Sequence, residues 1–300
     1  MAKKILITGS NGLLGQQLVV HFSTSPDFKL LACSRGENKV LSVNNFRYYN
    51  LDITNKKDLN EVLQTEKPEI IINCAAMTNV DQCEEKQKEC DKINIDAVNE
   101  LVNYCKKNKT KLIHLSTDFI FDGKKGYYKE DDLPNPLNYY GKSKLKSEQL
   151  LIQSLSDFAI IRTILVYGTT QNTNRSNVVA WIKNSLESGK EIHVVSDQLR
   201  MPTLVTDLVK AIDLIIQKDA KGIFHISSNE LLSIYKIALL VAEEFNLDKT
   251  KINAITTREL NQKAKRPLKT GFLLAKAESE LGFKTKSFRE QIKEYKANLK

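Results

Sequence analysis

A tyrosine and a lysine stand four residues apart in the segment Tyr140-Gly141-Lys142-Ser143-Lys144. Residues with this spacing share one face of a helix, so their side chains would be neighbours there. An ammonium group beside a phenol stabilises the phenolate and lowers the pKa of the tyrosine from its usual value of about 10. The pair is a candidate general acid, with Tyr140 as the proton donor and Lys144 as its activator. Tyr139 is the weaker candidate, because Ser143 stands four residues after it.

A threonine that could bind a substrate oxygen precedes this pair. Ser116-Thr117-Asp118 follows the apolar run Lys111–Ser116, which is typical of a strand, so Thr117 would stand at the end of that strand. The Tyr-x-x-x-Lys spacing occurs by chance in many helices. Its interpretation as an active site therefore depends on finding a cofactor site in the same chain.

Such a site is predicted by three glycines in Thr8-Gly9-Ser10-Asn11-Gly12-Leu13-Leu14-Gly15. The loop follows a β-rich run and opens a segment with helical periodicity. Glycines at these places allow a tight turn, close approach of the backbone to a pyrophosphate and close packing of helix on strand, and the helix N-terminus attracts the anion. Glycine loops also serve as plain turns, but the strand before and the helix after favour a dinucleotide site. The loop residues predicted to bind the cofactor are Gly9, Asn11, Gly12, Leu13, Leu14 and Gly15.

The end of the second predicted strand indicates which dinucleotide binds. NAD sites place an acidic residue there to bind the ribose hydroxyls. This chain has Ser34 and Arg35, which suit the 2′-phosphate of NADPH, although NADH stays open and Arg35 could be a solvated surface residue. Asp52 and Ile53 follow a third strand-like run and are predicted to contact the cofactor. Asp52 could accept a hydrogen bond from the adenine amine or cap the helix that begins near Asn55.

Strand-like and helix-like segments alternate over the first 165 or so residues. The apolar strands are nearly continuous, which predicts an α/β fold with a doubly wound, Rossmann-type parallel sheet covered on both faces. We expect a cofactor domain over residues 1–168, with its last sheet elements returning near 190–226. Residues 169–300 would mainly form a smaller, mixed α+β substrate-binding lobe. The expected strands are Lys4–Ile7, Lys29–Cys33, Glu69–Cys74, Lys111–Ser116 and Phe158–Thr163, and the expected helices include Leu13–Phe22, Lys56–Thr65, Lys88–Asn108 and Tyr140–Leu155.

Composition excludes several classes of protein. The 300 residues are 41% hydrophobic and 27% charged, which are globular values, and no apolar run approaches a membrane span. Five cysteines without a Cys-x-x-Cys pair argue against a disulfide framework and favour a reducing cytoplasm, and four scattered histidines argue against a metal site. The net charge of +9 is spread along the chain without an aromatic-interleaved stripe. We therefore expect no nucleic-acid partner, and an anionic small molecule suits the positive field.

Taken together, these motifs resemble those of the extended short-chain dehydrogenases/reductases, and most of all the dTDP-4-dehydrorhamnose reductase family. The resemblance runs nearly end to end. It rests on the glycine loop and on Asn73-Cys74-Ala75-Ala76-Met77-Thr78-Asn79-Val80-Asp81, Ser116–Gly123, Pro136–Lys144, Arg162-Thr163, Val166-Tyr167-Gly168, Asp197-Gln198, Pro202-Thr203 and Arg266-Pro267.

The resemblance implies an NAD(P)H-dependent reductase of a nucleotide-linked 4-keto-6-deoxy sugar. It implies Thr117, Tyr140 and Lys144 as the catalytic group, and a second copy of the chain as a further candidate partner. Asn94 would support a proton relay or have no catalytic role. Further cofactor contacts would be Ala75, Ala76 and Thr78, and the substrate contacts would be Val80, Thr117, Asp118, Leu165, Arg200 and Arg266.

The chain also departs from the family pattern. Ile164 and Leu165 replace a serine and a tryptophan that helps to shape the sugar pocket, and we expect the only tryptophan, Trp181, in a core or interface. Phe119 stands where related dehydratases have a glutamate, which argues against dehydration. Two alternatives stay open: a nucleotide-sugar epimerase, and a non-catalytic NADP-binding regulatory subunit of the kind that serves methionine adenosyltransferase.

Overall fold

The computed structural model describes residues 2–171 and 177–299. Its centre is a seven-stranded sheet in the order β12-β7-β5-β4-β1-β2-β3, in which every pairing is parallel. The predicted α/β fold with a Rossmann-type doubly wound sheet is thereby confirmed. The strands are β1 (Lys3–Thr8), β2 (Phe28–Ser34), β3 (Arg47–Asn50), β4 (Ile70–Asn73), β5 (Lys111–Thr117), β7 (Phe158–Thr163) and β12 (Gly222–Ile226).

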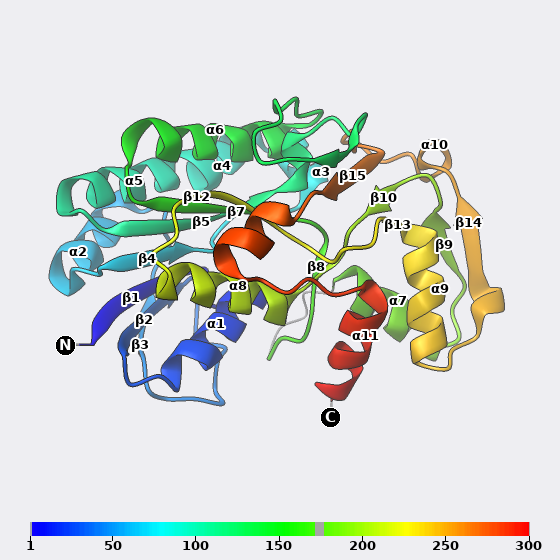
Figure 1. Cartoon of the computed structure of the whole chain (residues 1–300), viewed down its shortest axis with the longest axis horizontal. Coiled ribbons are helices and arrows are strands. Elements are labelled where there is room, and N and C mark those ends of the chain that lie inside the picture. Colours follow the sequence, from blue (N-terminus) through cyan, green and yellow to red (C-terminus); the bar gives the residue numbers. More distant parts are fainter. Residues whose placement is uncertain (1, 172–176, 300) are drawn as a thin grey trace.

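Helices cover both faces of this sheet (Figure 1). On one face lie α1 (Leu13–Ser23) and α8 (Val205–Gln217), and on the other lie α2 (Lys56–Glu66), α5 (Ala97–Asn108) and α6 (Tyr139–Ser154). Alternate residues of a strand enter opposite cores: Ile5 packs with Leu18 of α1, whereas Leu6 packs with Leu101 of α5. Burial on both faces explains why these strands are nearly continuous in apolar residues.

The expected helix over Lys88–Asn108 is present without a break, but it contains a π-helical turn. The structure has α3 (Val80–Glu85), α4 (Gln87–Asp91), a π-helical turn at Lys92–Asp96 and then α5. Asn94 in that turn is fully buried; its amide accepts a hydrogen bond from Met77 N at 2.8 Å and donates to Met77 O at 3.1 Å. The turn thus directs a polar residue inward, and helical periodicity does not signal it.

The remaining elements form a lobe beside the carboxyl ends of the sheet strands (Figure 1). Its core lies among α7 (Val178–Glu187), α9 (Ile234–Glu244), α11 (Phe288–Ala297) and the parallel pair β9 (Ile192–Val195) and β14 (Ile252–Ile255). Short strands too brief to predict link the two parts. They are β6 (Gly126–Tyr128), β10 (Leu199–Arg200), β13 (Leu232–Ser233) and β15 (Lys269–Phe272) in one sheet, and β8 (Val166–Tyr167) with β11 (Thr203–Leu204) in another. A division of the chain at residue 168 stays a prediction.

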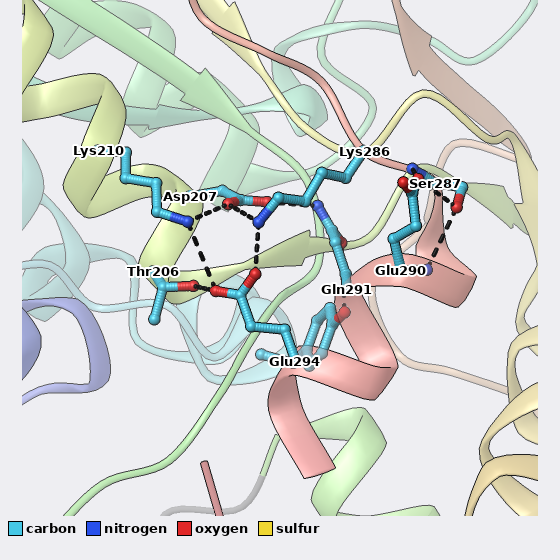
Figure 2. Close-up of polar contacts among 9 residues, drawn as sticks. Thr206, Asp207, Lys210, Lys286, Ser287, Glu290, Gln291 and Glu294 are labelled. Atoms are coloured by element: carbon cyan, nitrogen blue, oxygen red, sulfur yellow. Dashed lines mark hydrogen bonds and ion pairs between the residues drawn. The ribbon is translucent and has the colours of Figure 1, made fainter. Parts of the chain in front are cut away.

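The C-terminal helix is tied to α8 by a polar network (Figure 2). Lys286 binds the buried carboxylate of Asp207 at 3.2 Å and also pairs with Glu294. Gln291 donates to Asp207 at 2.9 Å and accepts from the hydroxyl of the fully buried Tyr167 at 3.2 Å. Because Tyr167 ends β8, the network fixes the lobe next to the strand that leads into the cavity described below.

Within the described ranges, no helix is both long and apolar enough to span a membrane. The same residues contain no group of three or more metal-ligating side chains, and all five cysteines are free thiols.

Candidate active site

A cavity of about 770 Å³ lies at the carboxyl ends of the sheet strands, between the sheet and the lobe. This is where ligands bind in doubly wound folds. Most of the predicted site residues meet in its wall although they come from distant segments. Those residues are Gly9, Asn11, Gly12, Leu13, Leu14, Gly15, Ala75, Ala76, Thr78, Val80, Thr117, Asp118, Tyr140, Lys144, Leu165, Arg200 and Arg266.

The backbone of the glycine loop lies very close to the neighbouring backbone segments. Gly9 has a φ of +67°, and a Cβ placed on it would lie 2.7 Å from Ala75 N. A Cβ on Gly15 would lie 2.3 Å from the carbonyl oxygen of Gly9, so helix and loop are in direct backbone contact. Side chains are therefore excluded from this turn for steric reasons.

The same loop offers the donors that a pyrophosphate needs. Gly12 is the N-cap of α1 and provides no side-chain cap, which leaves the backbone N–H groups of the first turn to an anion. Nearby, the Ser116 hydroxyl lines the cavity, is buried and has no hydrogen-bond partner within the described residues. These features fit a bound dinucleotide.

The residues predicted for the adenosine end lie outside the cavity wall. Arg35 is solvent-exposed and Asp52 is partly exposed, with 3.9 Å between a guanidinium nitrogen and a carboxylate oxygen. Asp52 does not cap α2: it accepts hydrogen bonds from Thr54, whereas Asn55 is the N-cap. Ile53 packs in the core beneath α2. Cofactor contacts of Ser34, Arg35, Asp52 and Ile53 stay predictions.

Tyr140 and Thr117 meet because α6 packs directly on the turn after β5. A Cβ on Gly141 would lie 2.2 Å from Phe119 O, so no larger residue fits there without movement. The edge of the Tyr140 ring packs on Phe119, with ring centroids 6.0 Å apart. Burial raises the pKa of Tyr140 above its usual value, and a hydrogen bond with Thr117 partly offsets this shift. The expected net lowering of this pKa is wrong for this arrangement, because burial of the phenol dominates.

Lys144 lies on the same helix face and is 2% exposed. Burial lowers the pKa of its ammonium to about 8, and the carboxylate of Glu148 opposes the shift. Its Nζ lies 3.0 Å from Nε2 of His114, a fully buried side chain of β5 that the sequence analysis did not single out.

The two predicted arginines differ in their surroundings. Arg200 is 3% exposed, donates to Leu199 O and Pro267 O at 2.7 Å each, and lies 3.7 Å from Asp118 Oδ2. Burial raises the pKa of Asp118, which the positive charge of Arg200 opposes. Arg200 therefore has a structural role beside the cavity. Arg266 is the more accessible of the two, and the contact of either arginine with a substrate stays a prediction.

The lobe side of the cavity contains residues that sequence reasoning missed. Trp181 of α7 lies in the cavity wall and is 41% exposed, so the expected core position is wrong, whereas an interface position stays a prediction. Leu165 also lines the cavity, from a backbone position with a φ of +44°, which is uncommon for leucine and occurs at ligand sites. His193, Leu260 and Gln262 complete this wall. Only the uniqueness of the tryptophan could have drawn attention to it.

Comparison with known proteins decides the family. A family model described as the RmlD substrate binding domain matches residues 3–300. The chain belongs to this family. Among RmlD relatives, a dTDP-4-dehydrorhamnose reductase of Aggregatibacter actinomycetemcomitans is 32% identical, with 98% of each chain aligned. The structure also superposes on a dTDP-4-dehydrorhamnose reductase of Bacillus anthracis in complex with NADP, with a TM-score of 0.85, 28% identity and coverage of 99% and 100% of the two chains.

RmlD-like sequences also include proteins with another name. The methionine adenosyltransferase 2 subunit beta of Bos taurus is 29% identical over 85% of this chain and 75% of its own. Membership of the family alone therefore does not separate a reductase from a subunit of a methionine adenosyltransferase.

Proposed function

We propose that the protein is an NADPH-dependent reductase of a nucleotide-linked 4-keto-6-deoxy sugar, similar to dTDP-4-dehydrorhamnose reductase. The observation that carries the proposal is the position of Tyr140 and Thr117 in one cavity with the glycine loop. The full-length similarity to reductases of this name, one of them in complex with NADP, supports it.

The glycine loop and the three catalytic residues have separate roles in the proposed reaction. The glycine loop and the N-terminus of α1 would hold the pyrophosphate of the cofactor, and the bound reduced nicotinamide supplies a hydride. Tyr140 donates its phenolic proton to the sugar oxygen as the carbonyl becomes an alcohol, and its raised pKa keeps that proton in place at neutral pH. Thr117 donates a hydrogen bond to the same oxygen. Lys144 then provides a positive charge near the phenolate that forms.

The substrate would span the cavity from sheet to lobe. Its sugar would lie at Thr117 and Tyr140, with Val80, Asp118 and Leu165 around it, and its nucleotide half would extend toward the lobe. Arg266 is the cation best placed for the diphosphate, because its side chain is partly exposed in the cavity wall. Trp181 offers a flat apolar surface for the base.

Two other functions are tested by the same assays. An epimerase would retain its cofactor, so net oxidation of NADPH would argue against it. A regulatory subunit is supported by the similarity to methionine adenosyltransferase 2 subunit beta, and it would bind a partner enzyme without reducing a sugar.

The first experiment is a thermal-shift panel with NADPH, NADH, dTDP and UDP, followed by absorbance of the reduced nicotinamide with dTDP-4-keto sugars. We expect NADPH and a nucleotide diphosphate each to raise the melting temperature, since ligands that bind the native state stabilise it. We also expect oxidation of NADPH with a keto sugar. No oxidation with any keto sugar, together with a stable complex with an adenosyltransferase, would move the assignment to the regulatory subunit.

We further propose a cytoplasmic location, which the free cysteines support. A homodimer is a second proposal that follows from the family resemblance, and sedimentation of the purified protein decides it.

A further inference from the structure

Behind the catalytic lysine runs a chain of four buried polar side chains. Lys144 Nζ lies 3.0 Å from His114 Nε2, His114 Nδ1 lies 3.0 Å from Asn73 Nδ2, and Asn73 Oδ1 accepts from the Thr8 hydroxyl. The four come from α6, β5, β4 and β1 in turn, and none is more than 2% exposed. The chain therefore connects the catalytic helix with the residue that immediately precedes Gly9 of the cofactor loop.

His114 stays neutral in this chain. Burial lowers its pKa well below the ordinary value, and the positive charge of Lys144 adds to the effect. A neutral imidazole has one donor nitrogen and one acceptor nitrogen, and its neighbours determine which is which.

The charge of Lys144 determines that choice. An ammonium can only donate, so a charged Lys144 requires Nε2 of His114 to accept and Nδ1 to carry the proton. Asn73 must then present its amide oxygen to Nδ1. A neutral Lys144 allows the reverse arrangement, in which Asn73 Nδ2 donates to Nδ1 and Nε2–H donates to the lone pair of Lys144 Nζ, 3.0 Å away.

We propose that His114 is a positioning residue of the active site that changes its protonated nitrogen with the charge of Lys144, and so holds the lysine in both states. The effect of His114 on turnover rests on the proposed reductase function, whereas the change of its protonated nitrogen does not. In either arrangement both ring nitrogens of His114 have a partner; with Lys144 charged, Asn73 turns its Nδ2 toward the Thr8 hydroxyl, which then accepts instead of donating. His114 thereby extends the pH range in which Lys144 keeps its charge on the helix face that it shares with Tyr140.

Other ionisable groups also face Lys144, and none replaces this hydrogen bond. Glu148 of α6 favours the ammonium, but its carboxylate is already paired with Arg162 of β7 at 2.8 Å. Burial raises the pKa of the Cys74 thiol, which follows β4, to about 12, so this group stays neutral; Cys90 of α4 is hydrogen-bonded with Ser143 and Asn94.

The direct test is nitrogen NMR of the wild-type protein labelled at its histidines, without substrate. His114 is assigned by the loss of one signal in His114→Gln. We expect Nδ1 to carry the proton at pH 6.5 and Nε2 to carry it at pH 9.5, with the change centred near the pKa of Lys144. The same tautomer at both values would overturn the proposal, whatever the enzyme's substrate is.

The second test is the pH profile of kcat. We expect His114→Phe to move the alkaline limb to lower pH by about one unit, because the ammonium loses its acceptor. In His114→Gln an amide oxygen can accept from Lys144, so the limb should return toward the wild-type position. Ile113→Val is the matched control, since it weakens the neighbouring position of β5 without reaching Lys144, and its limb should not move. Equal profiles for the Phe and Gln variants would show that His114 only fills space.

Discussion

Arg266 and Asp81 form a two-pronged ion pair at the edge of the cavity. The guanidinium nitrogens donate to the two carboxylate oxygens at 3.0 and 2.7 Å, across 185 positions of the chain. The pair lowers the pKa of Asp81, as expected for a carboxylate that accepts charged hydrogen bonds. It joins α3 to the segment before β15, so a diphosphate would have to share Arg266 with Asp81.

This pair makes the substrate proposal testable. We expect Arg266→Met to raise KM for the nucleotide sugar about tenfold or more, by removing a charge-assisted contact, and to leave the affinity for NADPH within about twofold. Asp81→Asn keeps the cation and should raise KM far less. If the two variants raise KM equally, the pair only holds the two segments together and Arg266 does not bind the diphosphate.

The central sheet could be predicted because its strands are buried on both faces. The residues of Ile70–Asn73 are all buried, and such a run has few other interpretations. The glycine loop and the Tyr140–Lys144 pair could also be predicted. All the residues of each motif lie within one turn or one helical repeat. The remaining site residues were predicted from the family resemblance.

Features that depend on contacts between distant segments could not be predicted. The two-residue strand Leu199–Arg200 exists only because β15 and β13 flank it. Burial of Arg200 depends on carbonyl groups about 67 positions away, and the place of Trp181 depends on how α7 packs against α9 and β9. In the sequence, His114 is one residue of an apolar strand. Only the fold places Lys144 and Asn73 beside it.

Arg200 is predicted to act on stability. Arg200→Leu leaves the buried carboxylate of Asp118 without its cation and frees two backbone carbonyl groups. Removing one partner of a buried pair costs about 3 kcal/mol or more. Chemical denaturation should show this loss, whereas Arg289→Leu, which breaks an exposed pair with Glu243, should leave stability almost unchanged. Unchanged stability of Arg200→Leu would show that these contacts of Arg200 do not stabilise the fold.

Arg35 is predicted to select NADPH. Its removal in Arg35→Ala should erode the ratio of NADPH to NADH efficiency, because a guanidinium matches the 2′-phosphate. Arg47→Ala is the matched control: its side chain is 67% exposed, against 66% for Arg35, and it lies near the start of β3, away from the cofactor edge. A ratio that is the same in both variants would make Arg35 an ordinary surface residue.

Tyr140 is predicted to supply the proton. Tyr140→Phe keeps the ring against Phe119 and deletes only the hydroxyl, so turnover should fall by at least about a hundredfold and NADPH affinity should stay within a few-fold. In the wild-type enzyme we expect turnover to decline above about pH 8, as Lys144 loses its proton. Steady-state rates and cofactor titrations check both statements, and a Phe variant with near-normal turnover would remove Tyr140 from the mechanism.

Trp181 is predicted to report the nucleotide half of the substrate directly. It is the only tryptophan in the chain, so the intrinsic fluorescence has a single indole source, and 41% of this residue is exposed in the cavity. We expect dTDP to quench this fluorescence by stacking on the indole ring. Trp181→Phe should bind dTDP within a few-fold of wild type by calorimetry, whereas Trp181→Leu should bind about tenfold more weakly, since loss of an aromatic stacking partner costs about 1–3 kcal/mol. Quenching by NADPH but not by dTDP would place the base elsewhere in the lobe.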